Sequence, residues 1–422
     1  MKNPFSYKAG PGFTKNLITL VTGTSIAQSL PVLVSPVLTR IYSPDDFGIL
    51  AIFMSLSVIL GIVANLKYEL AVLLPEKDEN AANLVSLGLI VSVVLSLLLA
   101  LFLLLFSDQV ITWLNEPRLK GWIYLVPAVV LLIGVYGMLN YFNTRIKKYK
   151  SIAFSRVAKS VAMVSVQLVA GFGKMAFGGL ILGYAVSHLF GNIKLFRNFI
   201  SNKRLLNAVN KNGMLSMAKR YKRFPQFTFP ATLSNKMATD LTNILISVIF
   251  TVTTLGFYSL AMRMLAFPSS LIGTSVGQLY MQEATSEKNK VGKATQSFGA
   301  ILVRLGLFGL PLFAVIFIFA EPIFGFVFGE EWRVAGTYAR YLIPLLYIRF
   351  VVSPVSVSLS VFEKQHLSLY VQLGMLIVTL LVFGYAWYMG LAFETFLLVY
   401  VITLSVYYLF FLLILFKTVK GK

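Results

Sequence analysis

The chain has 422 residues, of which 57% are hydrophobic and only 13% are charged. A soluble chain of this length would fold as two or three domains with polar exteriors, and this composition has too few polar residues to cover them. The composition therefore excludes a soluble protein and indicates one that is embedded in a membrane. Cysteine is absent, which excludes disulfides and thiolate metal sites.

Apolar stretches of about 20 residues follow one another along the whole chain. Lipid offers the backbone no hydrogen-bond partner, so a segment that crosses it must be a helix or a strand of a closed barrel. The stretches are about twice as long as a barrel strand and lack its alternation, which favours helices. We predict twelve spans, which are Asn16–Leu38, Phe47–Leu66, Ala82–Phe106, Trp122–Phe142, Ile152–Phe172, Met175–Phe196, Phe224–Phe250, Leu255–Tyr280, Ala300–Ala320, Tyr338–Val361, Leu369–Met389 and Phe393–Phe416.

The first span is preceded by a short basic leader. Its lysines, Lys2, Lys8 and Lys15, are spread out rather than clustered. The first apolar stretch is also longer than the apolar region of a signal peptide, so we expect no cleaved signal sequence.

The net charge of +21 is distributed unevenly over the connectors between the spans. The connectors after the fourth, sixth and eighth spans and the C-terminal tail are basic, whereas the odd-numbered connectors hold only scattered cations. This asymmetry follows the positive-inside rule and places both termini in the cytoplasm. Basic loops beside anionic lipid headgroups account for the charge without a nucleic-acid partner. The basic residues are Arg145, Lys147, Lys148, Lys150, Lys203, Arg204, Lys211, Lys219, Arg220, Lys222, Arg223, Lys288, Lys290, Lys293, Lys417, Lys420 and Lys422.

The longest polar stretch follows six spans and precedes six more. We therefore predict an N-terminal six-helix lobe at residues 1–196, a basic cytoplasmic linker at 197–223 and a C-terminal six-helix lobe at 224–422. Both lobes would begin on the same side of the membrane, so an internal repeat would be parallel, about an axis along the membrane normal. The stretch 41–48 resembles the stretch 249–256 at four positions, which agrees with such a repeat.

Signals of enzymatic activity are missing. The Gly-Lys pairs that begin at Gly173, Gly292 and Gly421 are not followed by Ser or Thr, so none forms a phosphate-binding loop and we expect no ATP site. The two histidines, His188 and His366, are too separated for a metal cluster, and we interpret His188 as an interfacial residue. We find no paired carboxylates at an acid–base spacing. We predict a protein that is not an enzyme and has no cofactor.

The seventh span carries charges near its centre, where each costs about 2.5–3.5 kcal/mol on insertion scales. Lys236 and Asp240 lie one helical turn apart and could form an ion pair that only neutralises itself. They belong to a polar stripe with Thr232, Asn243 and Ser247, because steps of three and four residues keep to one face of a helix. We expect Asn243 to line a cavity.

Arg263 in the eighth span and Arg349 in the tenth have no further acid at their depth. Unless backbone carbonyls pair with them, they must line water or a substrate path. An excess of cation suits an anionic or phosphorylated cargo, because arginine binds phosphate in a bidentate manner. Arg304 in the ninth span is shallower and could extend its side chain to the cytoplasmic surface.

In the first half of the chain, Arg156, Lys159 and Gln167 share one face of the fifth span, and the first span adds Ser25. Arg156 and Lys159 lie within two turns of a basic connector, so a role at the cytoplasmic rim and a role in a cavity are equally open. We expect Ser25 and Gln167 to form polar lining of the cavity.

Several segments, in order along nearly the whole chain, resemble Wzx-type polysaccharide flippases. Each segment is a weak motif alone, but the ordered set is specific. They are Thr39–Gly48, Lys67–Pro75, Phe224-Pro225, Leu255–Ala261, Gly277–Tyr280, Phe328–Trp332, Ser353-Pro354 and Glu363–Gln365.

The resemblance implies membership of the superfamily of multidrug/toxin extruders and lipid II flippases, an all-α membrane fold with two six-helix lobes in a V around a central cavity. It implies that the chain moves undecaprenyl-pyrophosphate-linked oligosaccharide repeat units from the cytoplasmic to the periplasmic leaflet of a bacterial inner membrane, for surface polysaccharides such as O-antigen or capsule. Membrane lipids, a polymerase and a chain-length regulator are the implied partners. Lys236, Arg263 and Arg349 stand in regions where the family has cavity cations.

We expect alternating access, with coupling to H⁺ or Na⁺ at Asp240 as an open possibility. The first alternative is a small-molecule antiporter of the same fold, although a cation exporter should have a net acidic cavity. The second is a membrane polymerase or ligase, which would ordinarily have a large outer loop. The third is a passive pore or scaffold, which nothing in the sequence excludes.

Overall fold

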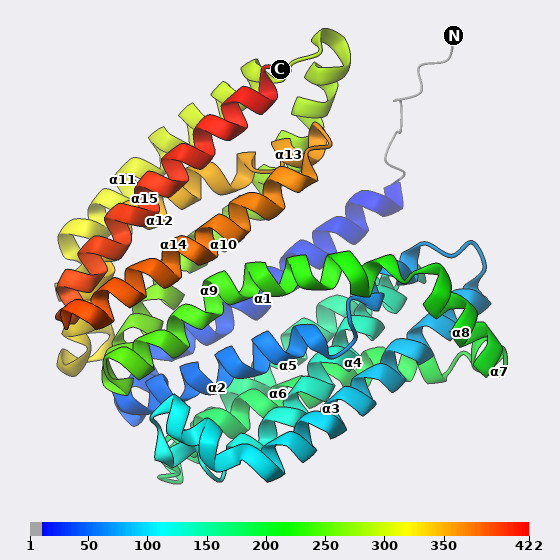
Figure 1. Cartoon of the computed structure of the whole chain (residues 1–422), viewed down its shortest axis with the longest axis horizontal. Coiled ribbons are helices and arrows are strands. Elements are labelled where there is room, and N and C mark those ends of the chain that lie inside the picture. Colours follow the sequence, from blue (N-terminus) through cyan, green and yellow to red (C-terminus); the bar gives the residue numbers. More distant parts are fainter. Residues whose placement is uncertain (1–10, 422) are drawn as a thin grey trace. The chain divides into compact units, whose positions relative to one another are not determined.

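The computed structural model describes residues 11–421, which are helical almost throughout. Lys2, Lys8 and Lys422 lie outside the described residues. Figure 1 shows the helices in chain order. They are α1 (Pro11–Ile41), α2 (Pro44–Val63), η1 (Tyr68–Leu73), α3 (Asp78–Leu114), η2 (Pro117–Leu119), η3 (Ile123–Leu125), α4 (Val126–Arg145), α5 (Tyr149–Phe172), α6 (Ala176–Ile200), α7 (Lys203–Asn207), α8 (Lys211–Arg220), η4 (Phe224–Thr228), α9 (Phe229–Ile249), α10 (Val252–Val291), α11 (Thr295–Phe328), η5 (Glu330–Trp332), α12 (Arg333–Val355), α13 (Ser358–Val361), α14 (Gln365–Met389) and α15 (Phe393–Val419).

Ten helices between residues 11 and 421 are long and apolar enough to cross a membrane. They correspond to the first six and the last four expected spans. The expected seventh and eighth spans also form helices, α9 and α10, but their polar residues keep them below the hydropathy of the other ten. Helix α10 has 40 residues and continues well beyond Tyr280, where we expected the span to end.

The helices pack into two compact units. The N-terminal unit contains the chain up to Val34, Leu56–Thr112 and Pro117–Leu233. The C-terminal unit contains Ser35–Ser55, Trp113–Glu116 and the chain from Ser234. The end of α1, from Ser35, and the first part of α2, up to Ser55, therefore pack with the C-terminal helices. The boundaries expected near residues 196 and 224 rest on the sequence and stay a prediction.

The stretch expected as a basic linker forms two short helices that pack on the core of the N-terminal unit. Asn202 caps α7 by accepting from Leu205 N, and Asn210 caps α8 by accepting from Gly213 N. Leu205 and Met217 are buried in a cluster that includes Phe142 of α4. The apolar faces of α7 and α8 are covered and their charged faces stay outside. This packing stabilises the two helices, which are too short to be stable alone.

In the C-terminal unit, the start of α2 packs against the start of α10. Thr253 Oγ1 donates a hydrogen bond to Asp45 of α2. Trp332 of η5 is almost fully buried beside this contact, with its ring 5.0 Å from that of Phe47 and 5.7 Å from that of Phe257. Its indole N–H donates to Thr39 O at 3.0 Å. Three signature segments therefore meet in one packed cluster, and their role is to stabilise the fold. They are Thr39–Gly48, Leu255–Ala261 and Phe328–Trp332.

Candidate functional site

Helix α9 carries the charged pair that the sequence placed at the centre of the seventh span. Lys236 Nζ donates to Asp240 Oδ2 at 3.2 Å, and Thr239 Oγ1 donates to the same oxygen at 2.9 Å. The lysine side chain is 45% exposed and the aspartate side chain 19%. The ion pair therefore lies within one helix, and Asp240 is the less exposed of its two side chains.

The other residues of the polar stripe on α9 form hydrogen bonds to α2 or within their own segment. Asn243 donates to Ser55 Oγ of α2 at 3.0 Å, and Ser247 is buried and donates to Ile244 O. Thr232 donates to Thr228 O one turn earlier. Asn243, expected to line a cavity, therefore holds α9 against α2.

Arg263 of α10 is half-buried, with its guanidinium 5.9 Å from the ring centre of Phe47. Among residues 11–421, no carboxylate lies within ion-pair distance of this guanidinium. An aromatic face offers a cation about 0.5–2 kcal/mol of attraction, less than a paired carboxylate would offer to a buried charge. Arg263 therefore keeps hydrogen-bonding capacity for a further anionic group.

Arg349 of α12 lines a polar cavity of about 280 Å³ inside the C-terminal unit. Its guanidinium lies 5.7 Å from the ring centre of Tyr408, and no carboxylate of the described chain pairs with it. Lys236, Asp240 and Arg263 do not line this cavity, so the expected cavity common to all four stays a prediction. The other lining residues are Asn235, Ser353, Ser356, Leu359, Ser368, Val371, Gln372, Met375, Tyr407, Tyr408 and Phe411.

Arg304 of α11 is exposed and lines a different cavity, of about 710 Å³, where α10 ends and α11 begins. Glu283 and Glu287 line the same cavity. Burial would raise the pKa of Glu287, but hydrogen bonds from the side chain and backbone of Ser297 and from Gln296 N outweigh it and lower the pKa. These acids fit the shallow, surface-directed position expected for Arg304 rather than a shared site with Arg349.

Two basic residues of α5, Arg156 and Lys159, contact neighbouring helices of the N-terminal unit. Arg156 donates to Thr24 Oγ1 of α1. Lys159 Nζ lies 2.8 Å from Nε2 of His188, a contact that we missed because we interpreted His188 as interfacial. That interpretation is wrong, since His188 is only 4% exposed and sits in the middle of α6.

The polar residues expected to line a cavity in this half lie in helix contacts or near them. Gln167 is only 3% exposed, and its amide donates to Leu180 O of α6 at 3.2 Å. A Cβ on Gly183 would meet Gln167 Cγ at 2.4 Å, so the glutamine lies directly against α6. Ser25 is half-buried on α1. The structure therefore places Gln167 in the α5–α6 contact rather than on a cavity wall.

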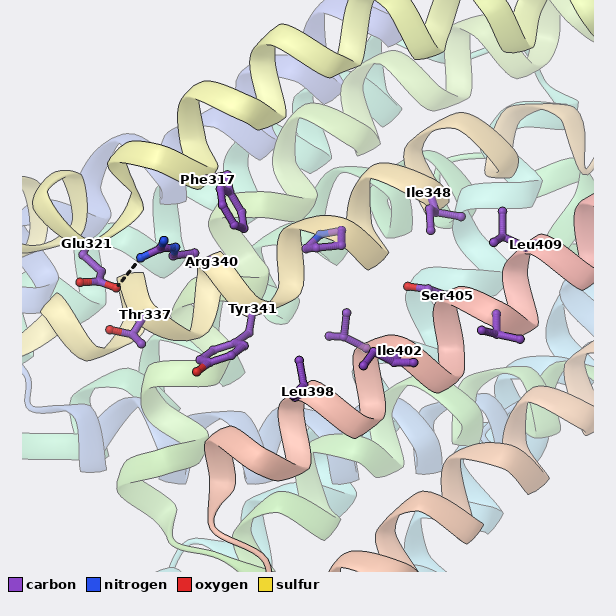
Figure 2. A pocket seen from close by; sticks show the side chains of 13 residues that line it. Phe317, Glu321, Thr337, Arg340, Tyr341, Ile348, Leu398, Ile402, Ser405 and Leu409 are labelled. Atoms are coloured by element: carbon purple, nitrogen blue, oxygen red, sulfur yellow. Dashed lines mark ion pairs between the residues drawn. The ribbon is translucent and has the colours of Figure 1, made fainter.

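A second large cavity of the C-terminal unit, about 710 Å³, runs between α11, α12 and α15 (Figure 2). Figure 2 shows Leu398, Ile402 and Leu409 of α15 along one side. At one end Arg340 Nη1 pairs with Glu321 Oε1 at 3.7 Å, while the other lining residues are mostly apolar. The cavity is thus an apolar groove with a charged end, the shape of a site for an amphipathic molecule.

The fold and these cavities define a multi-pass membrane protein with the architecture of a transporter. The structure is similar to the lipid II flippase MurJ in an inward closed conformation, with a TM-score of 0.72, 13% identity, and coverage of 96% of this chain and 87% of that one. It is also similar to an inward-facing multidrug resistance MATE family transporter of the MOP superfamily, with a TM-score of 0.65, 14% identity, and coverage of 96% and 94%. At these identities the likeness shows the fold alone, and it confirms the expected all-α fold of an integral membrane protein, while two six-helix lobes around a central cavity stay a prediction.

Residues 37–336 match the family described as "Polysaccharide biosynthesis protein", and the chain belongs to this family. The succinoglycan biosynthesis transport protein ExoT of Rhizobium meliloti (strain 1021) is 22% identical over 337 residues. That match covers 76% of this chain and 64% of the relative, so the chain spans less than two thirds of the relative's length. The family and this relative confirm the resemblance seen in the sequence motifs.

Proposed function

We propose that this protein moves undecaprenyl-pyrophosphate-linked oligosaccharide repeat units from the cytoplasmic to the periplasmic leaflet of a bacterial inner membrane, by alternating access, for the synthesis of a surface polysaccharide. The family, a relative named as a polysaccharide biosynthesis transport protein and the fold of a lipid II flippase support this proposal. The structural neighbours are transporters rather than enzymes, in keeping with a protein that carries its cargo chemically unchanged.

The observation that carries the proposal is the uncompensated arginine in a polar cavity. A charge inside a membrane protein is costly unless it has a partner, and the described residues offer Arg349 a tyrosine ring but no acid. The serines, asparagine, glutamine and tyrosines around it supply hydrogen-bonding groups of the kind that sugar hydroxyls and phosphate oxygens require. An anionic, hydroxyl-rich cargo matches this chemistry, whereas a cationic drug does not.

The apolar groove supports a cargo that carries a lipid. Its lining residues run from Leu398 to Leu409 on α15, which corresponds to about 16 Å of helix. This length is about half of the 30 Å hydrocarbon core, the depth of one leaflet. An isoprenoid chain along α15 would leave a phosphate at the end where Arg340 lies, within reach of a second cation.

The test is a comparison of arginine variants in cells that depend on this protein for surface polysaccharide. Arg349→Ala should abolish export while the protein still inserts and accumulates, and Arg349→Lys should restore it only in part, because a point charge replaces the bidentate fork. Arg263→Ala should behave in the same way. Arg204→Ala is the matched control, because the Arg204 side chain is 86% exposed and its surface ion pair contributes little.

Normal export by Arg349→Ala would contradict the role of this cavity. Export of cationic dyes by the intact protein, without flipping of a polyprenyl-pyrophosphate-linked oligosaccharide in proteoliposomes, would instead establish the antiporter alternative.

A further inference from the structure

We propose that Lys159 and His188 together form a proton-binding site in the N-terminal unit, and that this site couples proton movement to transport. The coupling rests on the proposed function, whereas the sharing of a proton between the two side chains does not. Asp240 was the group that the sequence favoured for ion coupling. In the structure, the carboxylate of Asp240 is already engaged by Lys236 and Thr239 on its own helix.

The two side chains meet at the middle of their helices. Lys159 lies ten residues after the start of α5, and His188 lies twelve residues from either end of α6. The helices approach closely because α6 presents small residues, Gly183, Ser187 and Gly191, at every fourth position. The stem of Lys159 lies on Gly191, where an added Cβ would meet Lys159 Cβ at 3.4 Å. The ammonium is therefore held inside the contact rather than extended toward a membrane surface.

The hydrogen bonds identify the tautomer of His188. Its Nδ1 lies 3.0 Å from Tyr184 O, and a carbonyl oxygen only accepts, so Nδ1 carries a hydrogen. In the neutral ring Nε2 then has a free electron pair, which accepts from Lys159 Nζ at 2.8 Å. Two basic nitrogens thus share one hydrogen bond and one positive charge.

The neighbouring elements supply no acid to this pair. Helix α4 contributes the ring of Tyr136, whose centre is 5.8 Å from Lys159 Nζ. Helix α6 contributes Tyr184, whose ring is 4.7 Å from that of His188. On α5, Arg156 lies one turn before Lys159 and is bound to Thr24 of α1. Every one of these groups is neutral or positive near neutral pH.

The acids of the N-terminal unit lie at helix ends or in connectors, and most already have partners. Glu69 pairs with Lys67, Asp78 with Arg145, Glu79 with Arg204 and Asp108 with Lys120. Glu76 lies in the connector between η1 and α3. Near the middle of these helices, proton exchange within the described part of the unit therefore falls to Lys159, His188 and the tyrosines. Tyrosines hold their proton far above physiological pH, which leaves the Lys–His pair.

A second proton changes the geometry of the pair. It can enter only at Nε2, and the hydrogen bond is then lost because both groups are donors and both are positive. Two like charges so close together beside a buried ring repel strongly, so Lys159 must move from His188 or release its own proton. Proton binding would therefore loosen the α5–α6 contact, and proton release would restore it.

Nitrogen-15 NMR of histidine-labelled protein tests the shared proton without any cargo. The chain has two histidines, so His366→Gln leaves the signals of His188 alone. We expect a neutral ring near neutral pH with hydrogen on Nδ1 and a hydrogen-bonded Nε2. Lys159→Met should shift the Nε2 signal, whereas Lys150→Met, a change at an exposed position on the same helix, should not. An Nε2–H tautomer, or an Nε2 signal that ignores Lys159→Met, would overturn the proposal.

The coupling is tested in proteoliposomes with a fluorescently labelled polyprenyl-pyrophosphate-linked oligosaccharide as the probe. An imposed pH gradient should accelerate flipping by the intact protein. His188→Gln and Lys159→Met should each reduce this acceleration about tenfold while exchange without a gradient continues, and His366→Gln and Lys150→Met should leave both unchanged. If the pH gradient still accelerates flipping by both His188→Gln and Lys159→Met, the proposed coupling is wrong. Failure of the intact protein to flip the probe would contradict the proposed function instead, and the NMR result would still decide the shared proton.

Discussion

Gly48 and Gly256 lie in reciprocal positions, each against the first residue of the other's helix. A Cβ on Gly48 of α2 would lie 2.0 Å from the carbonyl oxygen of Val252, the first residue of α10. A Cβ on Gly256 of α10 would lie 1.8 Å from the carbonyl oxygen of Pro44, the first residue of α2. The two helices therefore meet backbone to backbone, which only glycine permits at both positions.

The reciprocity follows the short internal match in the sequence. The offset between the glycines (256 − 48 = 208) equals that between the first residues of the helices (252 − 44 = 208). The same offset relates Asp45 to Thr253, and these two residues are joined by a hydrogen bond. Residues that correspond in the match thus face each other across a local two-fold contact.

We expect Gly48→Ala and Gly256→Ala each to destabilise the protein by about 1–3 kcal/mol, because the added methyl group meets a backbone carbonyl that cannot rotate away. Their effects should not add, because both open the same contact. Thermal unfolding of the purified protein measures this. Gly384→Ala on α14 is the control, since nothing lies within 4 Å of its added Cβ, and it should be neutral or stabilising. Equal melting temperatures for all three variants would show that α2 and α10 do not meet backbone to backbone at these glycines.

The spans could be predicted because each is long and continuously apolar, and hydropathy depends on composition alone. Hydropathy is lower for α9 and α10 because they carry polar residues. These residues find specific hydrogen-bond partners, as Asn243 does in Ser55, and hydropathy does not account for such partners. His188 was misjudged for a related reason. Its partner, Lys159, is 29 residues away on another helix, and no periodicity within α6 reveals a partner on α5. The isolation of Arg349 from acids was foreseen, because the sequence has few acids to offer.

The α10–α11 junction should loosen in acid. Because hydrogen bonding lowers the pKa of Glu287 in the folded protein, its carboxylate stabilises the fold above the unfolded pKa of about 4.3, and this contribution is lost as the pH falls through the folded pKa. Amide exchange at Gln296 and Ser297, corrected for intrinsic rate, should therefore accelerate in acid. Glu287→Gln should show fast exchange already near neutral pH. Glu283→Gln, one turn earlier, should keep the pH dependence of the unaltered protein.

Filling the apolar groove should displace a bound lipid chain. Ser405 lines the groove, so Ser405→Trp would occupy the space between α12 and α15. We expect polyprenyl phosphate, detected by native mass spectrometry, to bind at least severalfold less tightly, since an apolar contact contributes about 25 cal/mol per Å². Leu413→Trp is the control, because Leu413 is exposed on the same helix and does not line the groove. Equal binding to both variants would show that the lipid chain lies elsewhere.

The orientation in the membrane can be tested because the chain has no cysteine. Lys211→Cys, in the basic stretch at α8, should be protected in intact cells from an impermeant thiol reagent and react after the cells are opened. Lys120→Cys, between η2 and η3, should react from outside. Its exposed ion pair with Asp108 contributes little to stability, so its loss should not perturb the fold. Reaction at position 211 from outside would reverse the topology.

Because Lys236 and Asp240 form their ion pair within α9, the membrane potential exerts little net force on this helix. Moving one elementary charge across the membrane potential changes the free energy by about 2.3 kcal/mol per 100 mV. A pair whose two charges travel together on one helix displaces almost no net charge when that helix shifts, and no ion pair to another helix has to break. The electric field would therefore act on the cargo and on isolated cations such as Arg349. A shift of α9 would transfer almost no net charge across the membrane.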